Sequence, residues 1–208
     1  MKRIIAIQHP QSEQHVNRMI GSWHDWDLTE LGITQAHNIA KKLSSEIASD
    51  DYIIYSSDLL RTKHTAEIIS SYLHIVPIYD ARIRELNLGD AIGKSKEWAK
   101  NNLHCPVWSG TIDWASSADK RLFNGAETRR DLWNRVLQFY NEIVVPSDKN
   151  LIIISHSGTL SVLFAIWLNM SLESLNNSVI WGKSGGISVL LEDDGHHIIS
   201  KLSDMSYM

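Results

Sequence analysis

Two histidines stand in matching sequence contexts, far apart in the chain. His9 follows the aliphatic run at residues 2–8, and His156 follows the run at residues 150–155. Each run is typical of a short buried strand in a parallel sheet, and each histidine precedes a turn. Because the carboxyl ends of parallel strands meet at one edge of an open α/β sheet, two neighbouring strands would bring these imidazoles face to face.

An arginine and a glutamate could complete a site for an anion. Arg61 falls in the first turn of a predicted helix that follows a strand at residues 52–55. Its guanidinium and the free backbone N–H groups of that turn would point to the same place. Glu85 lies in a loop at residues 82–93, where its carboxyl group could transfer a proton to a leaving group.

These residue types match the cleavage of a phosphomonoester. That reaction needs a nucleophile, charge stabilisation on the phosphoryl oxygens and a proton for the leaving alcohol. His9 can attack through a neutral ring nitrogen, and it requires no metal and no other cofactor. His156 and Arg61 can hold the oxygens, and Glu85 can donate the proton. A histidine after a strand is often only a polar residue at a sheet edge, so the prediction depends on the four residues acting as a set.

The rest of the chain alternates strands with helices, which predicts an α/β fold with a mostly parallel sheet. Residues 13–27 are expected to form a long polar loop without regular structure. A strand at residues 74–79 should lie at the sheet edge, because Pro77 cannot donate a ladder hydrogen bond. Residues 186–192 and 197–202 should pair as a terminal hairpin.

Residues 94–124 interrupt the alternation. They carry Trp98, Trp108 and Trp114 among polar residues and have too few aliphatic side chains for a core of their own. We expect an inserted lid or specificity segment at about 94–124 within a single domain spanning residues 1–208.

Composition limits the partners and the location. The formal net charge of −4 argues against nucleic-acid binding, and Cys105 is the only cysteine, so neither an internal disulfide nor a Cys-rich zinc site is expected. The N-terminus lacks a signal-peptide core and the apolar runs are too short to span a membrane, so a cytoplasmic protein is expected. The expected partner is a phosphorylated small-molecule substrate, and the sequence indicates no particular oligomeric state.

Six segments carry a shared pattern in a fixed order. They are His9 with Ser12 and Asn17; residues 27–36; residues 56–66; Glu85 with Gly89 and Gly93; Gly125 with Glu127 and Thr128; and residues 155–158. Together they resemble the motifs of the histidine phosphatase superfamily, in its phosphoglycerate mutase-like branch. Each segment alone is a weak signal, whereas six in order cover nearly the whole chain.

The resemblance implies a phosphoglycerate mutase-like three-layer sandwich, with helices on both faces of the central sheet. It implies a histidine phosphatase that forms a phosphohistidine intermediate on His9. The residues it implicates are His9, Glu85 and His156 in catalysis, and Gln8, Asn17 and Arg61 in binding the substrate phosphate.

The chain departs from the family pattern at its first motif. Where the family has Arg-His-Gly, residues 8–10 read Gln-His-Pro. Gln8 can donate hydrogen bonds but carries no charge, and losing one such donor from a transition state costs about 3 kcal/mol. His15 and Arg18 lie in the same loop and are candidates for part of the missing charge. Ser157 stands where a glycine is usual.

Other functions fit parts of the pattern. A weakened pocket would leave a module that binds phosphorylated molecules without turnover, and a phosphoglycerate mutase would pass the phosphate to a second hydroxyl group. Ser157 could also form an α/β-hydrolase triad with an aspartate at 193 or 194 and a histidine at 196 or 197, although the flanking glycines of that motif are missing. A metal site is disfavoured, because no His-x-x-x-His pair stands with a carboxylate on a helix.

Overall fold

The computed structural model describes residues 1–104, 107–108, 111–112, 117–176 and 178–208. Within these residues, six strands form one sheet in the order β3-β2-β6-β1-β7-β8. The strands are β1 (Lys2–Gln8), β2 (Tyr52–Ser56), β3 (Ile78–Tyr79), β6 (Asn150–Ser155), β7 (Ile187–Asp193) and β8 (His196–Asp204). Pairing is parallel from β3 to β1 and antiparallel at β7 and β8, which confirms the predicted mostly parallel sheet.

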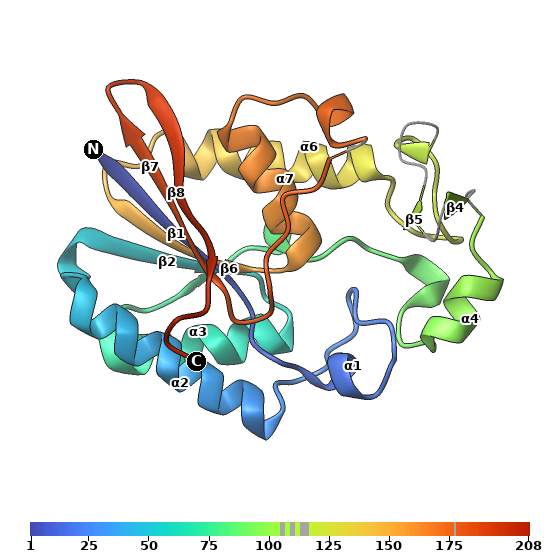
Figure 1. Cartoon of the computed structure of the whole chain (residues 1–208), viewed down its shortest axis with the longest axis horizontal. Coiled ribbons are helices and arrows are strands. Elements are labelled where there is room, and N and C mark those ends of the chain that lie inside the picture. Colours follow the sequence, from blue (N-terminus) through green and yellow to red (C-terminus); the bar gives the residue numbers. More distant parts are fainter. Residues whose placement is uncertain (105–106, 109–110, 113–116, 177) are drawn as a thin grey trace.

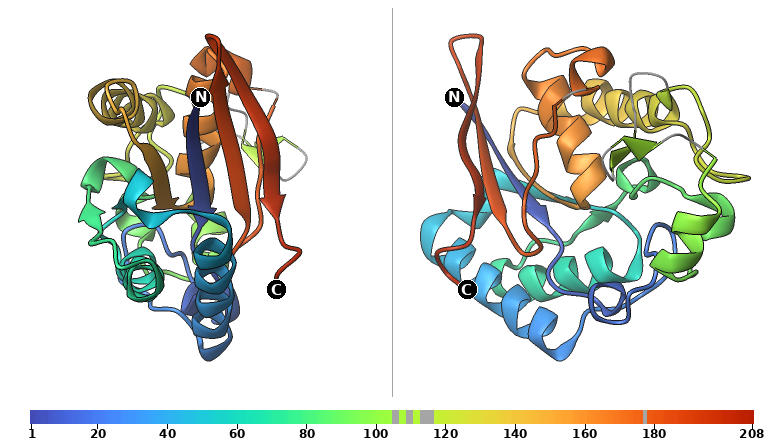
Figure 2. Two further views of the ribbon diagram at one scale, coloured as in Figure 1. Left: turned by 90° about the vertical axis from the view of Figure 1, so that its left-hand side faces the viewer. Right: turned by 45° about the vertical axis from the view of Figure 1, so that its right-hand side comes forward.

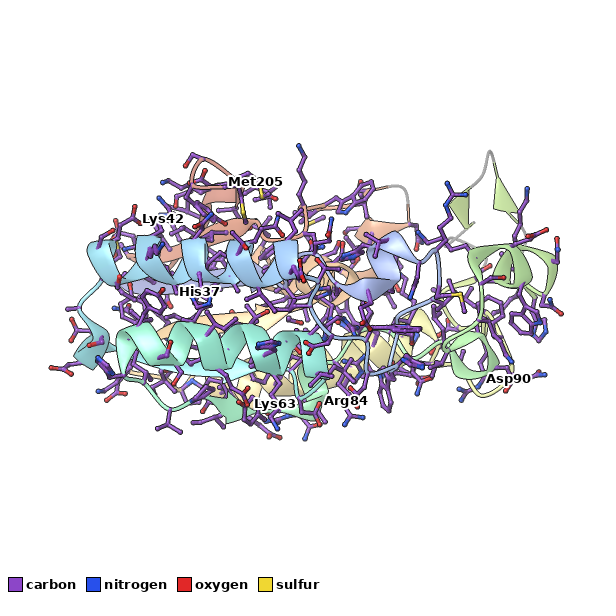
Figure 3. All side chains as sticks on the ribbon, turned by 90° about the horizontal axis from the view of Figure 1, so that it is seen from below. His37, Lys42, Lys63, Arg84, Asp90 and Met205 are labelled. Carbon is purple, nitrogen blue, oxygen red and sulfur yellow. The ribbon has the colours of Figure 1, made fainter. Side chains whose placement is uncertain are left out.

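Helices cover both faces of the sheet (Figure 1). The helices α2 (Glu30–Glu46) and α3 (Leu60–Leu73) lie on one face, and α6 (Arg129–Phe139) and α7 (Ser157–Trp167) lie on the other. Figure 3 shows α2 and α3 side by side with His37 between them, where its Nδ1 lies 3.1 Å from the Tyr72 hydroxyl. The predicted three-layer arrangement is therefore confirmed.

Shorter helical segments connect these elements. They are α1 (Glu13–Val16), α4 (Lys96–Asn101), the 3₁₀ turns at Ser49–Asp51, Ala81–Ile83, Gly89–Ala91 and Leu172–Leu175, and a π-helical turn at Tyr140–Val144 that extends α6. No helix among the described residues combines the length and the apolarity that a bilayer crossing requires.

The side chains of β1 alternate between the two cores. Ile5 and Ile7 pack with the residues of α2 and α3, whereas Ile4 and Ala6 pack with those of α6 and α7. All four are at most 1% exposed. Full burial of one such aliphatic side chain stabilises a fold by about 1.5–3 kcal/mol, so this strand is held rigidly on both sides.

The segment that follows β1 packs against the first turn of α2. The hydroxyl of Thr29 caps α2 by accepting the backbone N–H of Gly32 at 3.1 Å. A side chain at Gly32 would place its Cβ 1.9 Å from the carbonyl oxygen of Gln11. Only glycine allows this approach, and it fixes the path of the chain beyond His9.

Two predicted elements differ from the structure. Residues 13–27 are not wholly irregular, because α1 forms a helical turn in which Nδ1 of His15 accepts the backbone N–H of Ser12 at 3.1 Å. The strand expected at 74–79 is reduced to β3, since His74 adopts a left-handed conformation (φ 58°) at the end of α3. The edge position predicted for this strand is confirmed.

Residues 94–124 carry α4 and the paired strands β4 (Val107–Trp108) and β5 (Thr111–Ile112). In Figures 1 and 2 these elements lie at the end of the molecule remote from the β7–β8 turn. The ring of Trp98 packs 6.1 Å from that of Phe123. Cys105, Trp114 and the side chain of Trp108 lie outside the described residues. The role of this segment as a lid stays a prediction.

Candidate active site

The parallel pairing of β1 with β6 places His9 and His156 side by side. The register runs from Ile4 opposite Leu151 to Gln8 opposite Ser155. The backbone N–H of His9 donates to the carbonyl oxygen of Ser155 at 3.0 Å. The two imidazole centroids are 5.1 Å apart, with the ring planes at 64°. The rings therefore meet as the strand pattern predicts.

The hydrogen bonds of His9 define its tautomer. Nδ1 lies 2.9 Å from the carbonyl oxygen of Pro10, which can only accept, so Nδ1 carries the proton. Nε2 is then the ring nitrogen with a lone pair, and it accepts a hydrogen bond from Nε of Arg61 at 3.2 Å. Nε2 is therefore the ring nitrogen that can attack an electrophile once the hydrogen bond from Arg61 is given up.

Both imidazoles are neutral at pH 7. Burial, reinforced by the positive charge of Arg61, holds the pKa of His9 and the pKa of His156 well below the ordinary value of 6.5. A neutral ring keeps its lone pair, which is the state a nucleophilic His9 needs.

Acid should destabilise the fold through these two histidines. In the unfolded chain each regains its ordinary pKa of 6.5 and binds a proton that the folded protein excludes. We therefore expect the free energy of unfolding to fall as the pH drops from about 7 to about 5, by up to about 1.4 kcal/mol per pH unit for each histidine. Urea unfolding at several pH values measures this slope. The slope should be shallower in His9→Gln and His156→Gln than in the wild type. His196 is exposed, so His196→Gln is the control and should keep the wild-type slope. Equal slopes in the wild type and all three variants would contradict this explanation.

Arg61 is fixed by backbone carbonyl groups. The residue is 1% exposed, and its Nη2 and Nη1 donate to the carbonyl oxygens of Ser22 at 2.8 Å and His24 at 3.0 Å. Burial lowers the pKa of Arg61 to about 10, so the side chain remains a cation at neutral pH. A desolvated and immobile cation beside Nε2 of His9 is suited to stabilising a phosphoryl group.

His156 is held by Ser57. Nε2 of His156 lies 2.9 Å from the Ser57 hydroxyl, which in turn accepts the backbone N–H of Leu59 at 3.4 Å. Both side chains are fully buried. Among the residues that the structure describes, Nδ1 of His156 has no hydrogen-bond partner.

The carboxylate of Glu85 is held at the start of α7. One oxygen accepts the backbone N–H of Gly158 at 3.1 Å, and the other accepts that of Leu86 at 2.9 Å. The carbonyl oxygen of Glu85 accepts hydrogen bonds from Nε1 of Trp23 and Nη2 of Arg135, each at 2.7 Å. This loop is therefore fixed at both its backbone and its side chain.

Three of the four predicted residues border one cavity of about 420 Å³, whereas His156 is fully buried and is not among the lining residues. His9, Arg61 and Glu85 line it together with Ser157 and Gly158. The arrangement offers a neutral nitrogen nucleophile, a fixed cation and a carboxyl group around one space. It can perform nucleophilic substitution on an anionic centre with proton transfer to the leaving group.

The family model of the histidine phosphatase superfamily (branch 1) matches residues 4–205. The chain belongs to this superfamily. It is 30% identical over 177 residues to a protein of Hydrogenobacter thermophilus with the provisional name phosphoserine phosphatase 2, and the match covers 85% of this chain and 84% of that protein. It is 25% identical over 193 residues to a 2,3-bisphosphoglycerate-dependent phosphoglycerate mutase of Methylobacterium sp., covering 87% and 88% of the two chains.

Solved structures confirm the predicted fold. A mycobacterial glucosyl-3-phosphoglycerate phosphatase in complex with VO3 superposes with a TM-score of 0.80 at 22% identity, over 98% of this chain and 99% of that one.

Only some of the residues predicted to bind phosphate line the cavity of this superfamily member. Gln8, at 8% exposure, and His15 line it, and Ser157 does so too. Asn17 is exposed, and its side-chain oxygen accepts the backbone N–H of Met19 at 2.9 Å. Arg18 is also exposed, and neither it nor Asn17 is among the cavity-lining residues.

The serine hydrolase alternative is wrong, because the residues of its triad lie at opposite ends of the sheet. β7 is antiparallel to β1, with Glu192 opposite Lys2 and Ile187 opposite Ile7. The β7–β8 turn, which carries the aspartates and histidines of the supposed triad, therefore lies at the end of the sheet remote from Ser157.

Sequence reasoning missed Arg135, which holds the loop that carries Glu85. Arg135 pairs with Glu127 at 2.8 Å and also donates to the carbonyl oxygens of Arg82 and Arg84, each at 2.7 Å. Glu127 further accepts the backbone N–H of Asn87 at 2.9 Å. Glu127 belongs to a family motif, but nothing local marks Arg135, because its partners lie in a distant loop.

Gly158 leaves room for Glu85, and filling that room should impair turnover. A Cβ at this position would lie 2.6 Å from Oε1 of Glu85, so in Gly158→Ala the carboxylate must move. With Glu85 in the proton-transfer role predicted for it, we expect kcat to fall by about 10- to 100-fold, because small displacements of a reacting group cost this much. Alanine is favoured over glycine in a helix by about 1 kcal/mol, so the free energy of unfolding should not decrease. Steady-state kinetics measure kcat, and urea unfolding of the same preparation measures the free energy of unfolding. An unchanged kcat would show that the position of Glu85 is unimportant.

Proposed function

We propose that this histidine phosphatase superfamily member is a metal-independent phosphomonoesterase that works through a phosphohistidine on His9. The observation that carries the proposal is the neutral His9 ring, whose Nδ1 is bound to the Pro10 carbonyl and whose Nε2 lies 3.2 Å from Arg61 in an open cavity. An imidazole held in this way has its one lone pair at Nε2, and an incoming phosphoryl group would take the hydrogen bond that Arg61 now donates to that nitrogen.

The reaction would proceed in two displacements. Nε2 of His9 attacks phosphorus as the ester P–O bond breaks, and the leaving oxygen takes the bond electrons together with a proton from Glu85. Water then attacks the phosphohistidine, giving a proton to Glu85 and releasing inorganic phosphate and neutral His9. Arg61 stabilises the phosphoryl oxygens in both steps. His156 would join it through Nδ1, which has no hydrogen-bond partner among the described residues.

Gln8 stands where the family pattern has a charged arginine, and His15 is the better placed of the two candidates to offset this difference. Its ring stacks on that of His9, with centroids 5.5 Å apart and planes at 9°. Burial lowers the pKa of His15, and its Nδ1 accepts the Ser12 N–H, so the neutral ring carries its proton on Nε2. His15 would therefore contribute a hydrogen-bond donor more than a full charge.

We expect His15→Ala to lower kcat/KM for a phosphate ester by about tenfold, the value of one hydrogen bond to a charged group. Arg18→Ala should leave it unchanged, because Arg18 is exposed and lies outside the cavity-lining set. The two variants are measured against the same substrate. Unchanged kinetics in both would end the idea that this loop offsets the loss at residue 8.

The names of the relatives support phosphatase chemistry on small phosphorylated molecules. They include phosphoserine and glucosyl-3-phosphoglycerate phosphatases as well as the phosphoglycerate mutase. Residues 94–124 would shape substrate access, since Lys96 at the start of α4 lines the cavity. The mutase is the second candidate, and the match to the Methylobacterium protein favours it.

A panel of phosphate esters tests the proposal. Release of inorganic phosphate by the wild type, undiminished by a chelator, is the expected result. Transfer of the phosphoryl group to a second hydroxy acid instead of water would favour the mutase. Binding of phosphate esters without turnover across the panel would overturn the enzymatic proposal in favour of a binding module.

A further inference from the structure

The two helices on one face of the sheet, α6 and α7, also line the cavity with residues that have no part in the proposed chemistry. On α7, Gly158 holds Glu85, and Ser161 and Val162 line the cavity one turn further along, about 5 Å away along the helix axis. On α6, Arg129 and Leu132 lie three residues apart, on one face, and line the same cavity. The alcohol part of an ester held at His9 would extend into this region.

Most of this region is apolar. Leu86, Leu88, Leu132 and Val162 contribute to its lining. Such a surface favours an apolar ligand body through the hydrophobic effect, and a cavity of about 420 Å³ accommodates a group the size of an aromatic ring with a short side arm.

Arg129 places a positive charge in this apolar wall. It is 8% exposed, and its Nη2 donates to the carbonyl oxygen of Leu175 at 3.0 Å, which fixes the guanidinium between α6 and the 3₁₀ turn Leu172–Leu175. Burial lowers the pKa of Arg129 to about 10, so it is still cationic at neutral pH. A desolvated guanidinium attracts an anion more strongly than a surface one, and its planar fork fits a carboxylate.

Ser161 adds a buried hydroxyl group to this wall of the cavity. It is 7% exposed and lines the cavity, yet its Oγ has no hydrogen-bond partner in the part of the chain that the structure describes. Buried hydroxyl groups are usually hydrogen-bonded, so this one is available to donate to a ligand.

We propose that the cavity selects phosphate monoesters whose alcohol has an apolar body and a carboxylate at the end remote from the phosphate. Arg129 and Ser161 bind that carboxylate, while Leu132 and Val162 contact the body. The assignment rests on the proposed function, because it takes the phosphate to be held at His9.

A pair of matched esters tests this specificity. The phosphate ester of para-hydroxyphenylpropanoic acid and that of its primary amide have the same size and the same phenol leaving group, and only the acid carries the carboxylate. We expect the wild type to favour the acid in kcat/KM by about 10- to 100-fold, as a hydrogen-bonded ion pair provides. In Arg129→Gln the ratio should fall close to one, and Arg129→Lys should retain part of the preference. Ser161→Ala, a small change that leaves the helix intact, should reduce the ratio several-fold.

The neighbouring Arg130 is the matched control. It is half-exposed and pairs with Asp119 on the surface, so Arg130→Gln should keep the wild-type ratio. A wild-type ratio near one, or the same ratio in Arg129→Gln and Ser161→Ala as in the wild type, would overturn the assignment. Release of nitrophenol from para-nitrophenyl phosphate distinguishes failure of the specificity proposal from failure of the proposed function. Turnover of this ester without a preference for the acid overturns only the specificity. No turnover of any ester overturns the proposed function as well.

Discussion

Replacing His9 with alanine is expected to lower kcat for phosphate ester hydrolysis by about 10⁵-fold, the size of effect seen when a nucleophile is removed. His156 is not placed to replace it, because it is fully buried and is not among the residues that line the cavity. Initial rates with para-nitrophenyl phosphate measure the loss, since this substrate needs little help with its leaving group.

The matched control is His64→Ala. His64 lies on α3 with its Nδ1 2.9 Å from a carboxylate oxygen of Asp27, and it is not among the cavity-lining residues. Its loss should leave kcat close to that of the wild type. If His9→Ala retained a sizeable fraction of the activity, nucleophilic attack by this residue would be disproved.

Replacing Arg61 with glutamine should reduce both activity and stability. Without the guanidinium we expect kcat/KM to fall by about 10³-fold, the upper range for one transition-state donor. The carbonyl groups of Ser22 and His24 lose their partners, so the free energy of unfolding should fall by about 1–3 kcal/mol. The pKa of His9 should rise when the neighbouring cation is removed, which moves the acidic limb of the kcat/KM profile to higher pH.

Arg82→Gln is the control for loss of an arginine. Arg82 pairs with Asp80 and Glu142 near the surface, where such pairs contribute about 1 kcal/mol or less, and it does not line the cavity. A pH profile that did not move in Arg61→Gln would contradict the electrostatic coupling of Arg61 to His9, even if the rate fell.

The sequence predicted the central part of the fold because the decisive signals are local. Aliphatic runs that end at His9 and His156 define two parallel strands, and the strand-to-helix turn before Arg61 aims that residue at the same sheet edge. That these two strands are neighbours was a hypothesis, and the parallel pairing of β1 with β6 confirms it.

Contacts between distant loops were not predictable in the same way. Both Asn17 and His15 are polar residues of one loop, and only the helical turn α1 decides that His15 stacks on His9 while Asn17 faces solvent. Arg135 is important for its bond to the carbonyl oxygen of Glu85, and Ser161 for the cavity beside it. Tertiary packing creates both surroundings, and no motif in the sequence predicts them.

The most direct test is to look for the phosphorylated histidine itself. Wild type and Glu85→Gln are mixed with para-nitrophenyl phosphate, quenched in alkali to preserve the phosphorus–nitrogen bond, and mapped by peptide mass spectrometry. The account predicts a phosphoryl group on His9, present at higher occupancy in Glu85→Gln because the second displacement is slowed, and none in His9→Ala. Rapid turnover with no phosphoryl group on His9 in either protein would contradict it.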